Sequence, residues 1–478
     1  MLLNDLIGDD GEIVGDKNVE INSLTFKSAE VKKGSLYFCL KGENFDGHNF
    51  AREVSSLGAS AIVVEKLQQV NIPQVLVKNT RSALSKFCAK FYQNPEKSLK
   101  FIGITGTNGK TTSTFIIKSI LKEAGYKVGV IGTQGTFING RSYKTNLTTP
   151  DPTELFATLR KMVDMKVDYV VMEASAHAIY LNKLDGITFE VGVITNITQD
   201  HLDFFNTMKH YEKTKISFLN SKHVKTAVVN IDDSRIRNNL SKINVPTISY
   251  GLNNPSDVFA LDIEKSLSCS KFVVNALDSV FKVECNLVGQ FNVYNILAGI
   301  STCYALGVNE KTIIRGLKKV KAPLGRFSVI NLSKDITVII DFAHTPDGME
   351  NVLKTIKDVY FEKLICVFGC GGNRDTGKRS IMGSIAEKYS NYVVITSDNP
   401  RFEDPSKILD DIEKGMKKDN HIKIVDRREA IKYALTLVQD GGVIALLGKG
   451  AELYQDINGV KTPYNDFEEI EKILWQTY

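Results

Sequence analysis

The stretch Gly103-Ile-Thr-Gly-Thr-Asn-Gly-Lys-Thr-Thr112 decides the fold of this 478-residue chain. The apolar run Phe101–Ile104 predicts a buried strand at its start, and the pattern over Thr111–Ala124 predicts a long helix after it. In a glycine-rich turn between a strand and a helix, backbone N–H groups point at phosphate oxygens, and the helix dipole favours negative charge there. The stretch therefore predicts a nucleotide-binding loop within an α/β fold.

The spacing of this loop is Gly106-x-x-Gly109-Lys110-Thr111. It departs from the full GxxxxGK[ST] pattern because Ile104 stands where the first glycine is expected. Lys110 is placed to reach the β- and γ-phosphates, and the Thr111 hydroxyl is placed to hold Mg²⁺. A glycine-rich turn with a chance Lys-Thr pair is the alternative, and the strand–loop–helix context disfavours it.

Short apolar runs alternate with helical patterns along most of the chain, which predicts an α/β protein with largely parallel sheets. The predicted strands are 35–40, 61–64, 74–77, 101–104, 128–131, 169–172, 191–195, 226–229, 337–340, 364–368, 392–396 and 443–446; the helices that we expect outside the nucleotide loop include 49–57 and 81–92.

The length predicts three domains at about 150 residues each. The turn-rich segment 93–97 and Ala322-Pro323 mark the boundaries. We expect a small α/β domain over 1–98 and a central, mostly parallel domain of the phosphate-loop type over 99–321, with a β-rich insert at 248–288. A dinucleotide-binding-like (Rossmann-like) domain follows over 322–478, and its lack of a GxGxxG motif argues against a nicotinamide cofactor.

The composition excludes several classes of protein. Hydrophobic residues make up 43% and charged residues 24%, as in soluble globular proteins. The net charge of +5 is spread without a dense basic stripe, so we expect no nucleic-acid partner. No run approaches the ~18 apolar residues of a membrane helix, so we expect no membrane insertion. Seven scattered cysteines and a start without a targeting pattern favour the cytoplasm.

Two polar segments follow predicted strands of the central domain. Glu173 closes the strand 169–172, where a carboxylate in the sheet of the phosphate loop is placed to bind a magnesium ion. His201 lies in the polar turn Asn196-Ile-Thr-Gln-Asp-His-Leu-Asp203 after the next strand. An ordinary strand-end glutamate and a structural histidine remain the alternatives for these two residues.

These motifs and several later ones resemble the Mur ligase family, the ATP-dependent amide-forming enzymes of peptidoglycan precursor synthesis. The resemblance covers the whole chain in order and implies three α/β domains. The motifs that carry it are Gly106-Thr-Asn-Gly-Lys-Thr-Thr112, Glu173-Ala-Ser-Ala-His177, Asn196–Asp203, His210-Tyr-Glu-Lys-Thr-Lys215, Gly289-Gln-Phe-Asn-Val-Tyr-Asn295, Asp341-Phe-Ala-His-Thr-Pro346 and Gly448-Lys-Gly-Ala-Glu452.

Within the family, the chain resembles the ligases that add the third residue to UDP-N-acetylmuramoyl-L-alanyl-D-glutamate. The segments that indicate this are Thr148-Thr-Pro-Asp151, Gly369-Cys-Gly-Gly-Asn-Arg-Asp-Thr-Gly-Lys-Arg379 and Asp398-Asn-Pro-Arg401. The arginine in the last segment favours meso-2,6-diaminopimelate over L-lysine, because it offers a planar fork for the extra carboxylate. L-lysine remains the alternative acceptor.

The resemblance implies catalytic roles for Lys110, Glu173, His201 and Lys215. An ammonium cannot ligate Mg²⁺, so the family match implies that Lys215 acts as a carbamate, which supplies oxygen ligands. The implied metal ligands are therefore Thr111, Glu173, His201 and carbamylated Lys215. The implied ATP-binding residues are Gly106, Thr107, Asn108, Gly109, Lys110, Thr111, Thr112, Asn292, Asn295, Arg326, Asp341 and His344.

The resemblance also implies two further substrate sites. Residues implied for the UDP-muramoyl-peptide are Ser28, Asp46, Gly47, His48, Thr148, Thr149, Ser175 and Lys183, with the segment around the uracil beginning at Asn44. Residues implied for the diamino acid are Arg374, Asp398, Asn399, Arg401, Gly448 and Glu452. ATP, the UDP-linked dipeptide and the diamino acid are thus the expected partners of a monomeric enzyme.

The chain departs from the usual family pattern at Ala29, Ala176, Lys183 and Ala451, and each departure concerns a substrate contact. Alternatives to the diaminopimelate ligase are a folylpolyglutamate-synthetase-like ligase, a phosphate-loop ATPase that joins no substrates, and an inactive relative. The ATPase would hydrolyse ATP without a small-molecule acceptor, and the inactive relative would lack one of the magnesium or phosphate residues, all of which are present.

Overall fold

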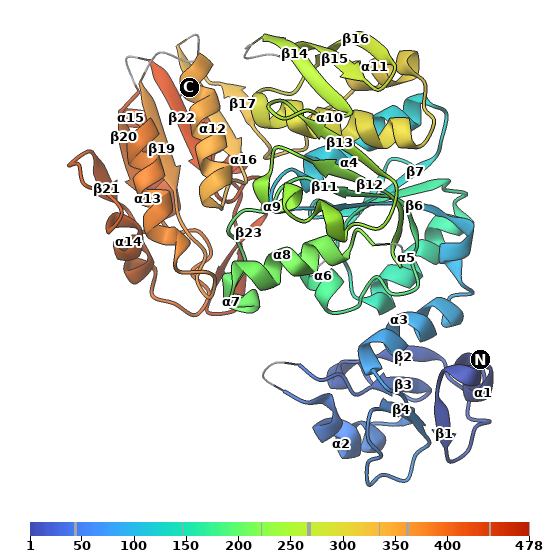
Figure 1. The fold of residues 1–478 in the computed structure, drawn as a ribbon. Coiled ribbons are helices and arrows are strands. Elements are labelled where there is room, and N and C mark those ends of the chain that lie inside the picture. Colours follow the sequence, from blue (N-terminus) through green and yellow to red (C-terminus); the bar gives the residue numbers. More distant parts are fainter. Residues whose placement is uncertain are drawn as a thin grey trace. The chain divides into compact units, whose positions relative to one another are not determined.

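The computed structural model describes residues 1–42, 45–145, 147–220, 222–264, 269–333, 335–359, 363–438 and 441–477, so Asn44 lies outside the described residues. The chain forms two compact units. One contains Met1–Thr105, Gly125–Gly192 and Phe218–Thr226, and the other contains Gly106–Ala124, Val193–Ser217 and Ala227–Tyr478. Both units combine helices with parallel-rich sheets, which confirms the predicted α/β fold (Figure 1).

The first unit opens with a five-stranded sheet in the order β1-β5-β4-β3-β2. Its strands run parallel, except that β1 is antiparallel to β5. All four side chains of β3 are buried, as in a strand covered on both faces. The strands are β1 (Glu12–Val14), β2 (Ser23–Thr25), β3 (Ser35–Phe38), β4 (Ala59–Val64) and β5 (Gln74–Leu76), and the helices are α1 (Leu3–Ile7), α2 (Ala51–Ser56) and α3 (Thr80–Phe91).

A second set of strands in this unit includes the strand that leads to the phosphate loop. Strands β6, β10 and β7 are parallel, and β8 and β9 continue as an antiparallel hairpin. Every residue of β10 is buried, including the terminal Glu173. The elements are β6 (Lys100–Thr105), β7 (Val128–Gly132), β8 (Gly135–Ile138), β9 (Arg141–Tyr143), β10 (Tyr169–Glu173), α5 (Pro152–Asp164) and α6 (Ala176–Tyr180).

The second unit contains the helix after the phosphate loop and the strands of the predicted insert. Strands β12, β13 and β14 are parallel, whereas β14, β15 and β16 are antiparallel, which confirms the β-rich insert. Strands β11 (Phe189–Ile194) and β12 (Val224–Asn230) have residues in both units. The other elements are α4 (Lys110–Glu123), α7 (Leu202–Phe205), α8 (Met208–Ser217), α9 (Ser234–Arg237), β13 (Thr247–Gly251), β14 (Val258–Glu264), β15 (Ser270–Ala276), β16 (Ser279–Cys285), α10 (Gln290–Ala305) and α11 (Glu310–Lys318).

The C-terminal segment of this unit, residues 328–477, is built on a six-stranded sheet in the order β17-β18-β22-β19-β20-β21. Only β17 is antiparallel to its neighbour. The elements are β17 (Ser328–Asn331), β18 (Ile336–Asp341), α12 (Pro346–Val359), β19 (Leu364–Phe368), α13 (Lys378–Tyr389), β20 (Tyr392–Ile395), α14 (Pro405–Glu413), β21 (His421–Lys423), α15 (Arg427–Thr436), β22 (Gly442–Leu447), β23 (Tyr454–Ile457), β24 (Val460–Pro463) and α16 (Asp466–Thr477).

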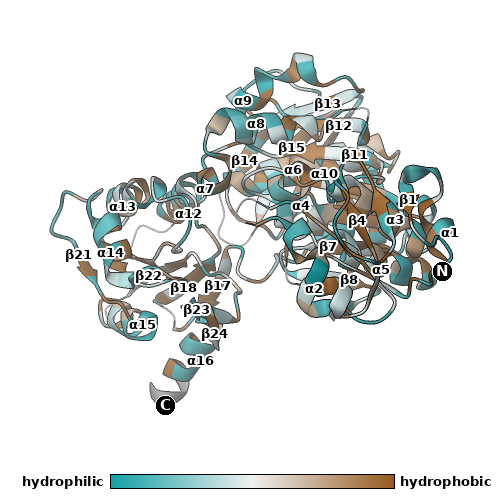
Figure 2. Cartoon of the chain, turned by 90° about the horizontal axis from the view of Figure 1, so that it is seen from below, coloured by the Kyte–Doolittle hydropathy of each residue, from teal (hydrophilic) through white to brown (hydrophobic). Residues whose placement is uncertain are grey.

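Alternate residues of this sheet serve two hydrophobic cores. In β19, Leu364, Cys366 and Phe368 pack with α12, α13 and α14, whereas Ile365 and Val367 pack with α15 and α16. Hydrophobic colouring is accordingly concentrated on strands such as β18 and β22, while the helices show both colours (Figure 2). The sheet thus has helices on both faces, as predicted for a Rossmann-like domain.

Element ends differ slightly from the sequence predictions. Helix α2 begins at Ala51 rather than at residue 49, because Gly47–Phe50 form a 3₁₀ turn capped by Asp46. The short strands β1, β2, β8, β9, β17, β21, β23 and β24 were not predicted, since three or four residues carry little periodic signal. All seven cysteines are buried. Among the described residues, no helix combines the length and the apolar character that crossing a membrane requires.

Candidate active site

The phosphate loop has the backbone that its glycines predict. Gly106 and Gly109 have φ angles of 140° and 86°, which L-residues with side chains rarely adopt. A Cβ atom at Gly106 would overlap Thr195 Oγ1, and one at Gly109 would overlap Asn295 Oδ1. Gly109 is also the N-cap of α4, so the loop ends at a helix N-terminus, where backbone N–H groups lack helical partners.

Two lysines donate to the same carbonyl of this loop. Lys110 Nζ lies 2.9 Å from Gly106 O and 2.8 Å from Thr107 O. Lys215 Nζ, from α8, lies 2.7 Å from Gly106 O. Lys215 is only 1% exposed, and burial together with the charge of Lys110 holds its pKa well below the ordinary value. By composition alone, the charged segment Glu212-Lys-Thr-Lys215 suggests a solvated helix face, and the burial of Lys215 contradicts this interpretation.

Asp200 gathers three basic side chains beside the loop. Its carboxylate lies 3.3 Å from His201 Nε2, 3.6 Å from His344 Nε2 and 3.4 Å from Lys378 Nζ. Burial alone would raise the pKa of Asp200, but the nearby basic groups outweigh it and hold the pKa well below its ordinary value. Gln199 Nε2 also donates to Asp375 Oδ2 at 2.9 Å, so the turn at residues 199–203 contacts the loop before α13.

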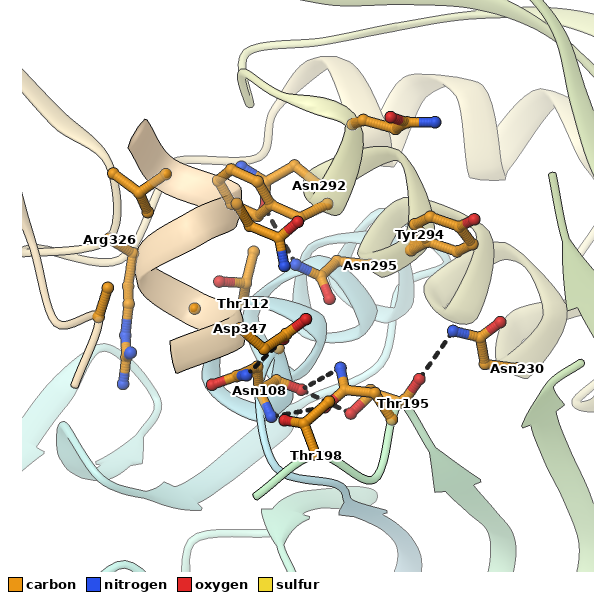
Figure 3. A pocket seen from close by; sticks show the side chains of 18 of the residues that line it. Asn108, Thr112, Thr195, Thr198, Asn230, Asn292, Tyr294, Asn295, Arg326 and Asp347 are labelled. Carbon is orange, nitrogen blue, oxygen red and sulfur yellow. Dashed lines mark hydrogen bonds between the residues drawn. The ribbon is translucent and has the colours of Figure 1, made fainter. Parts of the chain in front are cut away.

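A cavity of about 380 Å³ opens beside the loop. Figure 3 shows its lining from the phosphate loop, α10 and the start of α12. Asn292 and Asn295 face the cavity from α10; Asn295 Nδ2 donates to Asn292 Oδ1, and Asn292 Nδ2 donates to Val288 O. Gly289 is the N-cap of α10. Further lining residues are Asn108, Gly109, Thr112, Asp232, Tyr294, Arg326, Asp341 and Asp347.

Arg326 and Asp341 line the cavity from the start of the C-terminal segment and the residues before it. Arg326 Nη2 lies 3.3 Å from Thr111 Oγ1, and its guanidinium lies 4.5 Å from the centre of the Phe342 ring. Asp341 accepts the backbone N–H groups of Phe327 and Ala343, each at 2.7 Å. Burial raises the pKa of Asp341 against the opposing charge of Arg326.

In the first unit, Glu173 is held at the end of β10. Its Oε1 accepts the Thr133 N–H at 2.9 Å, and its Oε2 accepts the Thr133 hydroxyl at 3.1 Å. The Thr149 hydroxyl donates to the Glu173 carbonyl at 2.7 Å, and Ser175 caps α6 close by. The Thr148 hydroxyl lies 3.1 Å from that of Thr133. The structure therefore brings together four residues that the family resemblance singled out, around one strand end.

Lys183, also in the first unit, forms an ion pair of 2.7 Å with Asp151. Asp46 accepts from the N–H of His48 and lies 2.6 Å from its Nδ1, while His48 Nε2 accepts from the Glu65 N–H. Because Nε2 is an acceptor, the ring proton is placed on Nδ1. Both ring nitrogens of His48 thus have partners within the protein, and Asp46 and His48 hold the local turn.

Gly47 and Ser28 complete the predicted residues of the first unit. A Cβ atom at Gly47 would lie 2.7 Å from the backbone N and O of Leu40, so only glycine fits there. Ser28 begins a short 3₁₀ turn, Ser28–Glu30.

The residues predicted for the diamino acid meet in the C-terminal segment. Arg401 Nη1 donates to Gly372 O at 2.7 Å, and the proximity of Arg374 to Arg401 adds to burial in lowering the pKa of Arg374. The positive charge of Arg401 thus disfavours the charged form of Arg374.

An acidic group lies in the same segment. Asn399 Nδ2 donates to Glu452 Oε2 at 2.9 Å, and Lys449, which is fully buried, lies 3.0 Å from that oxygen. A Cβ atom at Gly448 would lie 2.8 Å from Asp398 Oδ2. The loops of the C-terminal segment thus carry both cationic side chains, Arg374 and Arg401, and an anionic side chain, Glu452.

Sequence reasoning missed several residues of this arrangement, among them Asp200, Asn196, Lys378 and Asp347. Each lies inside or beside a motif that drew attention, but its partner lies far away in the sequence, so no local signal identified the pair. Within the described residues, no group of three or more histidine, cysteine, aspartate or glutamate side chains is clustered as a metal site.

Three family descriptions match the chain in order. "Mur ligase family, catalytic domain" matches residues 20–92, "Mur ligase middle domain" matches 104–303, and "Mur ligase, glutamate ligase domain" matches 325–450. The UDP-N-acetylmuramoyl-L-alanyl-D-glutamate–2,6-diaminopimelate ligase of Clostridium tetani is 41% identical over 471 residues, which cover 97% of both chains.

Solved structures agree with these matches. A structure of a UDP-N-acetylmuramoyl-L-alanyl-D-glutamate–2,6-diaminopimelate ligase has a TM-score of 0.71 at 29% identity and covers 100% of this chain and 99% of its own. The Mycobacterium tuberculosis folylpolyglutamate synthase has a TM-score of 0.67 at 18% identity and covers 77% of this chain and 92% of its own, a likeness of fold alone. The chain belongs to the Mur ligase family.

Proposed function

We propose that this chain is an ATP-dependent ligase that adds meso-2,6-diaminopimelate to UDP-N-acetylmuramoyl-L-alanyl-D-glutamate, in the synthesis of peptidoglycan precursors. The observation that carries the proposal is the phosphate loop with three basic side chains around it, Lys110, Lys215 and Arg326. Relatives with the same printed activity, matched over nearly the full chain, support the choice of substrates.

The reaction joins two anions before it forms the amide. A terminal carboxylate oxygen of the dipeptide attacks the γ-phosphorus of ATP, ADP leaves, and an acyl phosphate forms. The amine of the diamino acid then attacks the acyl carbon, phosphate leaves, and the amine loses a proton. Lys110 and Arg326 offset the negative charge that gathers in the first step, and the N–H groups of the loop bind the phosphates of ATP.

We further propose that magnesium accompanies ATP, with Thr111, Glu173, His201 and Lys215 as ligands. When bound, Mg²⁺ would neutralise phosphate charge. Lys215 as an ammonium does not fit this role. The buried, uncharged amine that the structure supports can attack CO₂ and release a proton, and the resulting carbamate supplies two oxygen atoms.

The UDP-linked substrate is proposed to contact Ser28, Gly47, Thr148, Thr149, Ser175 and Lys183. The Thr149 hydroxyl donates to the backbone carbonyl of Glu173 and lies 3.1 Å from the Ser175 hydroxyl, and we propose that a peptide carbonyl or carboxylate binds at these hydroxyl groups. Asp46 and His48 are proposed to stabilise the turn that binds uracil. Asp46 Oδ1 contacts His48 Nδ1, and His48 Nε2 accepts the Glu65 N–H. The division into domains at 1–98, 99–321 and 322–478 stays a prediction, as do a monomeric state and action in the cytoplasm.

The diamino acid is proposed to bind in the C-terminal segment. Arg374 and Arg401 offer paired cations for the distal carboxylate that diaminopimelate has and L-lysine lacks. Glu452 offers a carboxylate oxygen for the distal ammonium, and Asn399 orients this oxygen by a hydrogen bond of 2.9 Å.

The test is incubation with ATP, Mg²⁺, the UDP-linked dipeptide and a panel of diamino acids, with product mass and ADP release as readouts. Formation of the diaminopimelate tripeptide with one ADP per product is expected. Formation of the lysine tripeptide instead would identify L-lysine as the acceptor. ATP hydrolysis without any amide product would favour the ATPase alternative, and polyglutamylation of a folate would favour the folylpolyglutamate alternative.

A further inference from the structure

We propose that Asp347 is a positioning residue for the phosphate loop and that it acts through the side chain of Asn108. The proposal rests on the proposed function and adds to it a physical connection between the nucleotide loop and helix α12 of the C-terminal segment. Figure 3 shows the two side chains joined by a hydrogen bond at the edge of the nucleotide cavity.

The backbone of Asn108 is fixed from one side. Its N–H donates to Asn196 Oδ1 at 2.8 Å. Its carbonyl accepts the Thr195 hydroxyl at 2.6 Å and the Asn196 amide at 3.2 Å. These contacts come from the segment after β11 and hold the peptide that directly precedes Gly109 and Lys110. The side chain of Asn108 is therefore left to bond in another direction.

That side chain bonds to the first turn of α12. Asn108 Nδ2 donates to Asp347 Oδ2 at 2.8 Å, and the Thr345 hydroxyl donates to Asn108 Oδ1 at 3.3 Å. The same Thr345 hydroxyl accepts the Gly348 N–H at 3.1 Å. Both polar atoms of the Asn108 side-chain amide thus form hydrogen bonds with residues that lie more than 230 positions further along the chain.

The residues around Gly348 are closely packed. A Cβ atom at Gly348 would lie 3.0 Å from Thr345 Oγ1 and 3.4 Å from Asn108 Oδ1. Thr345 is fully buried, and Asn108, Asp347 and Gly348 all line the nucleotide cavity. A side chain at residue 348 would therefore press on Thr345 and Asn108 and require a shift of a few tenths of an ångström.

A carboxylate at this place opposes the ligand by charge, because ATP and ADP are polyanions. The Asp347 carboxylate nevertheless accepts a hydrogen bond from the neutral amide of Asn108 at 2.8 Å. Its hydrogen bond to Asn108 gives it a role that needs an acceptor oxygen and does not need a negative charge. We infer that the acceptor, not the charge, matters at residue 347.

The experiment measures ADP binding by calorimetry, since this readout needs no ligation. Asp347→Ala and Asn108→Ala are each expected to raise the Kd for ADP about tenfold, the range of one hydrogen bond to a charged group. The double variant is expected to bind ADP no more weakly than the weaker single variant, because both changes remove the same contact. Glu350→Ala, on the same helix but paired with Lys388 and Tyr389, is the matched control and should leave the Kd unchanged.

Two variants separate positioning from mere structural support. Asp347→Asn keeps an acceptor for Asn108 and removes the charge, so it should bind ADP at least as tightly as the wild type. In Gly348→Ala, the better helix propensity of alanine offsets the close contact with Thr345, so the melting temperature should stay within a few degrees, while ADP binding should weaken because the new methyl group presses on Asn108 and Thr345. An unchanged melting temperature with a raised Kd is not expected from loss of structure, and this variant still tests the proposal if Asp347→Ala does not fold.

The proposal is overturned if Asp347→Asn binds ADP as weakly as Asp347→Ala, if the losses of the two alanine variants multiply, or if Asp347→Ala or Gly348→Ala binds ADP like the wild type. Failure of the proposed function has a different signature. In that case wild-type protein makes no tripeptide, while the ADP measurements on the variants still decide the role of Asp347.

Discussion

The phosphate loop and the paired arginines of the C-terminal segment are both proposed to bind anions, yet they are built in different ways. In the loop, Lys110 donates to carbonyls three and four residues away, and the glycines that allow the turn lie within the same motif. Arg374 and Arg401, by contrast, lie 27 positions apart in the numbering, and Arg401 is held by the carbonyl of Gly372.

This difference separates what a local motif specifies from what the tertiary fold must assemble. The turn of the loop comes from its own glycines and from the start of α4, although Asn196 and Asp347 also hold Asn108. A change of the Lys110 side chain alone should therefore leave the fold intact. The arginine pair exists only when the loops after β19 and β20 are both in place. The predictions below test this contrast, from the largest expected effect to the smallest.

The first prediction concerns the local arrangement. Lys110→Ala should lower kcat by about 10²- to 10³-fold, because the transferred phosphoryl group loses a cation in the transition state. The melting temperature should stay within a few degrees, since the Lys110 side chain donates to two carbonyls of its own loop. Coupled ADP release and thermal unfolding measure the two effects. Lys122→Ala, an exposed lysine on the same helix, should behave like the wild type. An active Lys110→Ala enzyme would remove this residue from the mechanism.

The second prediction concerns a distant lysine that reaches the same carbonyl. Lys215→Met should lower kcat about a hundredfold, because no carbamate can form. It should also raise the melting temperature, since a buried amine with a strongly lowered pKa costs folding free energy that a thioether of similar size does not. Short-chain carboxylic acids added to Lys215→Ala should restore part of the activity.

Lys213→Ala is the matched control for this lysine, because Lys213 is exposed two residues earlier on α8. Intact-protein mass under bicarbonate should show the added carboxyl group on the wild type and on Lys213→Ala, but not on Lys215→Met. Equal activity of Lys215→Ala and the wild type would contradict the carbamate.

Sequence reasoning was most successful where the signal is local. The strand–loop–helix pattern around Gly106 and Gly109 and the burial of Glu173 at a strand end are both present. Strands β18, β19, β20 and β22 of the C-terminal sheet were predicted within one residue, because buried parallel strands are continuous apolar runs.

The same reasoning failed where a partner lies far along the chain. Composition described Lys215 as part of a solvated helix face, although its amine is buried against Gly106. No sequence pattern near Asp200 predicts that its carboxylate lies beside His344 and Lys378, which are 144 and 178 positions later in the numbering. Such pairs result from tertiary packing, which short-range periodicity does not encode.

The third prediction tests the assembled arrangement. Arg401→Ala should reduce the preference for meso-diaminopimelate over L-lysine by roughly 30-fold, because a buried arginine–carboxylate pair contributes about 2 kcal/mol or more. The measurement is kcat/KM for both diamino acids with the wild type and the variant. Arg428→Ala, an exposed arginine paired with Glu469, should leave the preference unchanged. A wild type that prefers L-lysine, or a variant with unaltered selectivity, would refute the assignment.

A variant of the acidic residue Glu452 shows whether the effect of Arg401→Ala reflects lost selectivity or general damage to the loops. Glu452 is proposed to bind the distal ammonium, which both diamino acids carry, so Glu452→Gln should weaken both substrates equally, by about tenfold. Substitution of Arg401 should therefore change the preference between the two diamino acids, whereas substitution of Glu452 should leave it unchanged. Because Glu452 also pairs with the buried Lys449, its variant tests loop integrity at the same time. If both variants lowered selectivity alike, the arginine pair would matter as a support of the loops and not as the cationic site for the carboxylate.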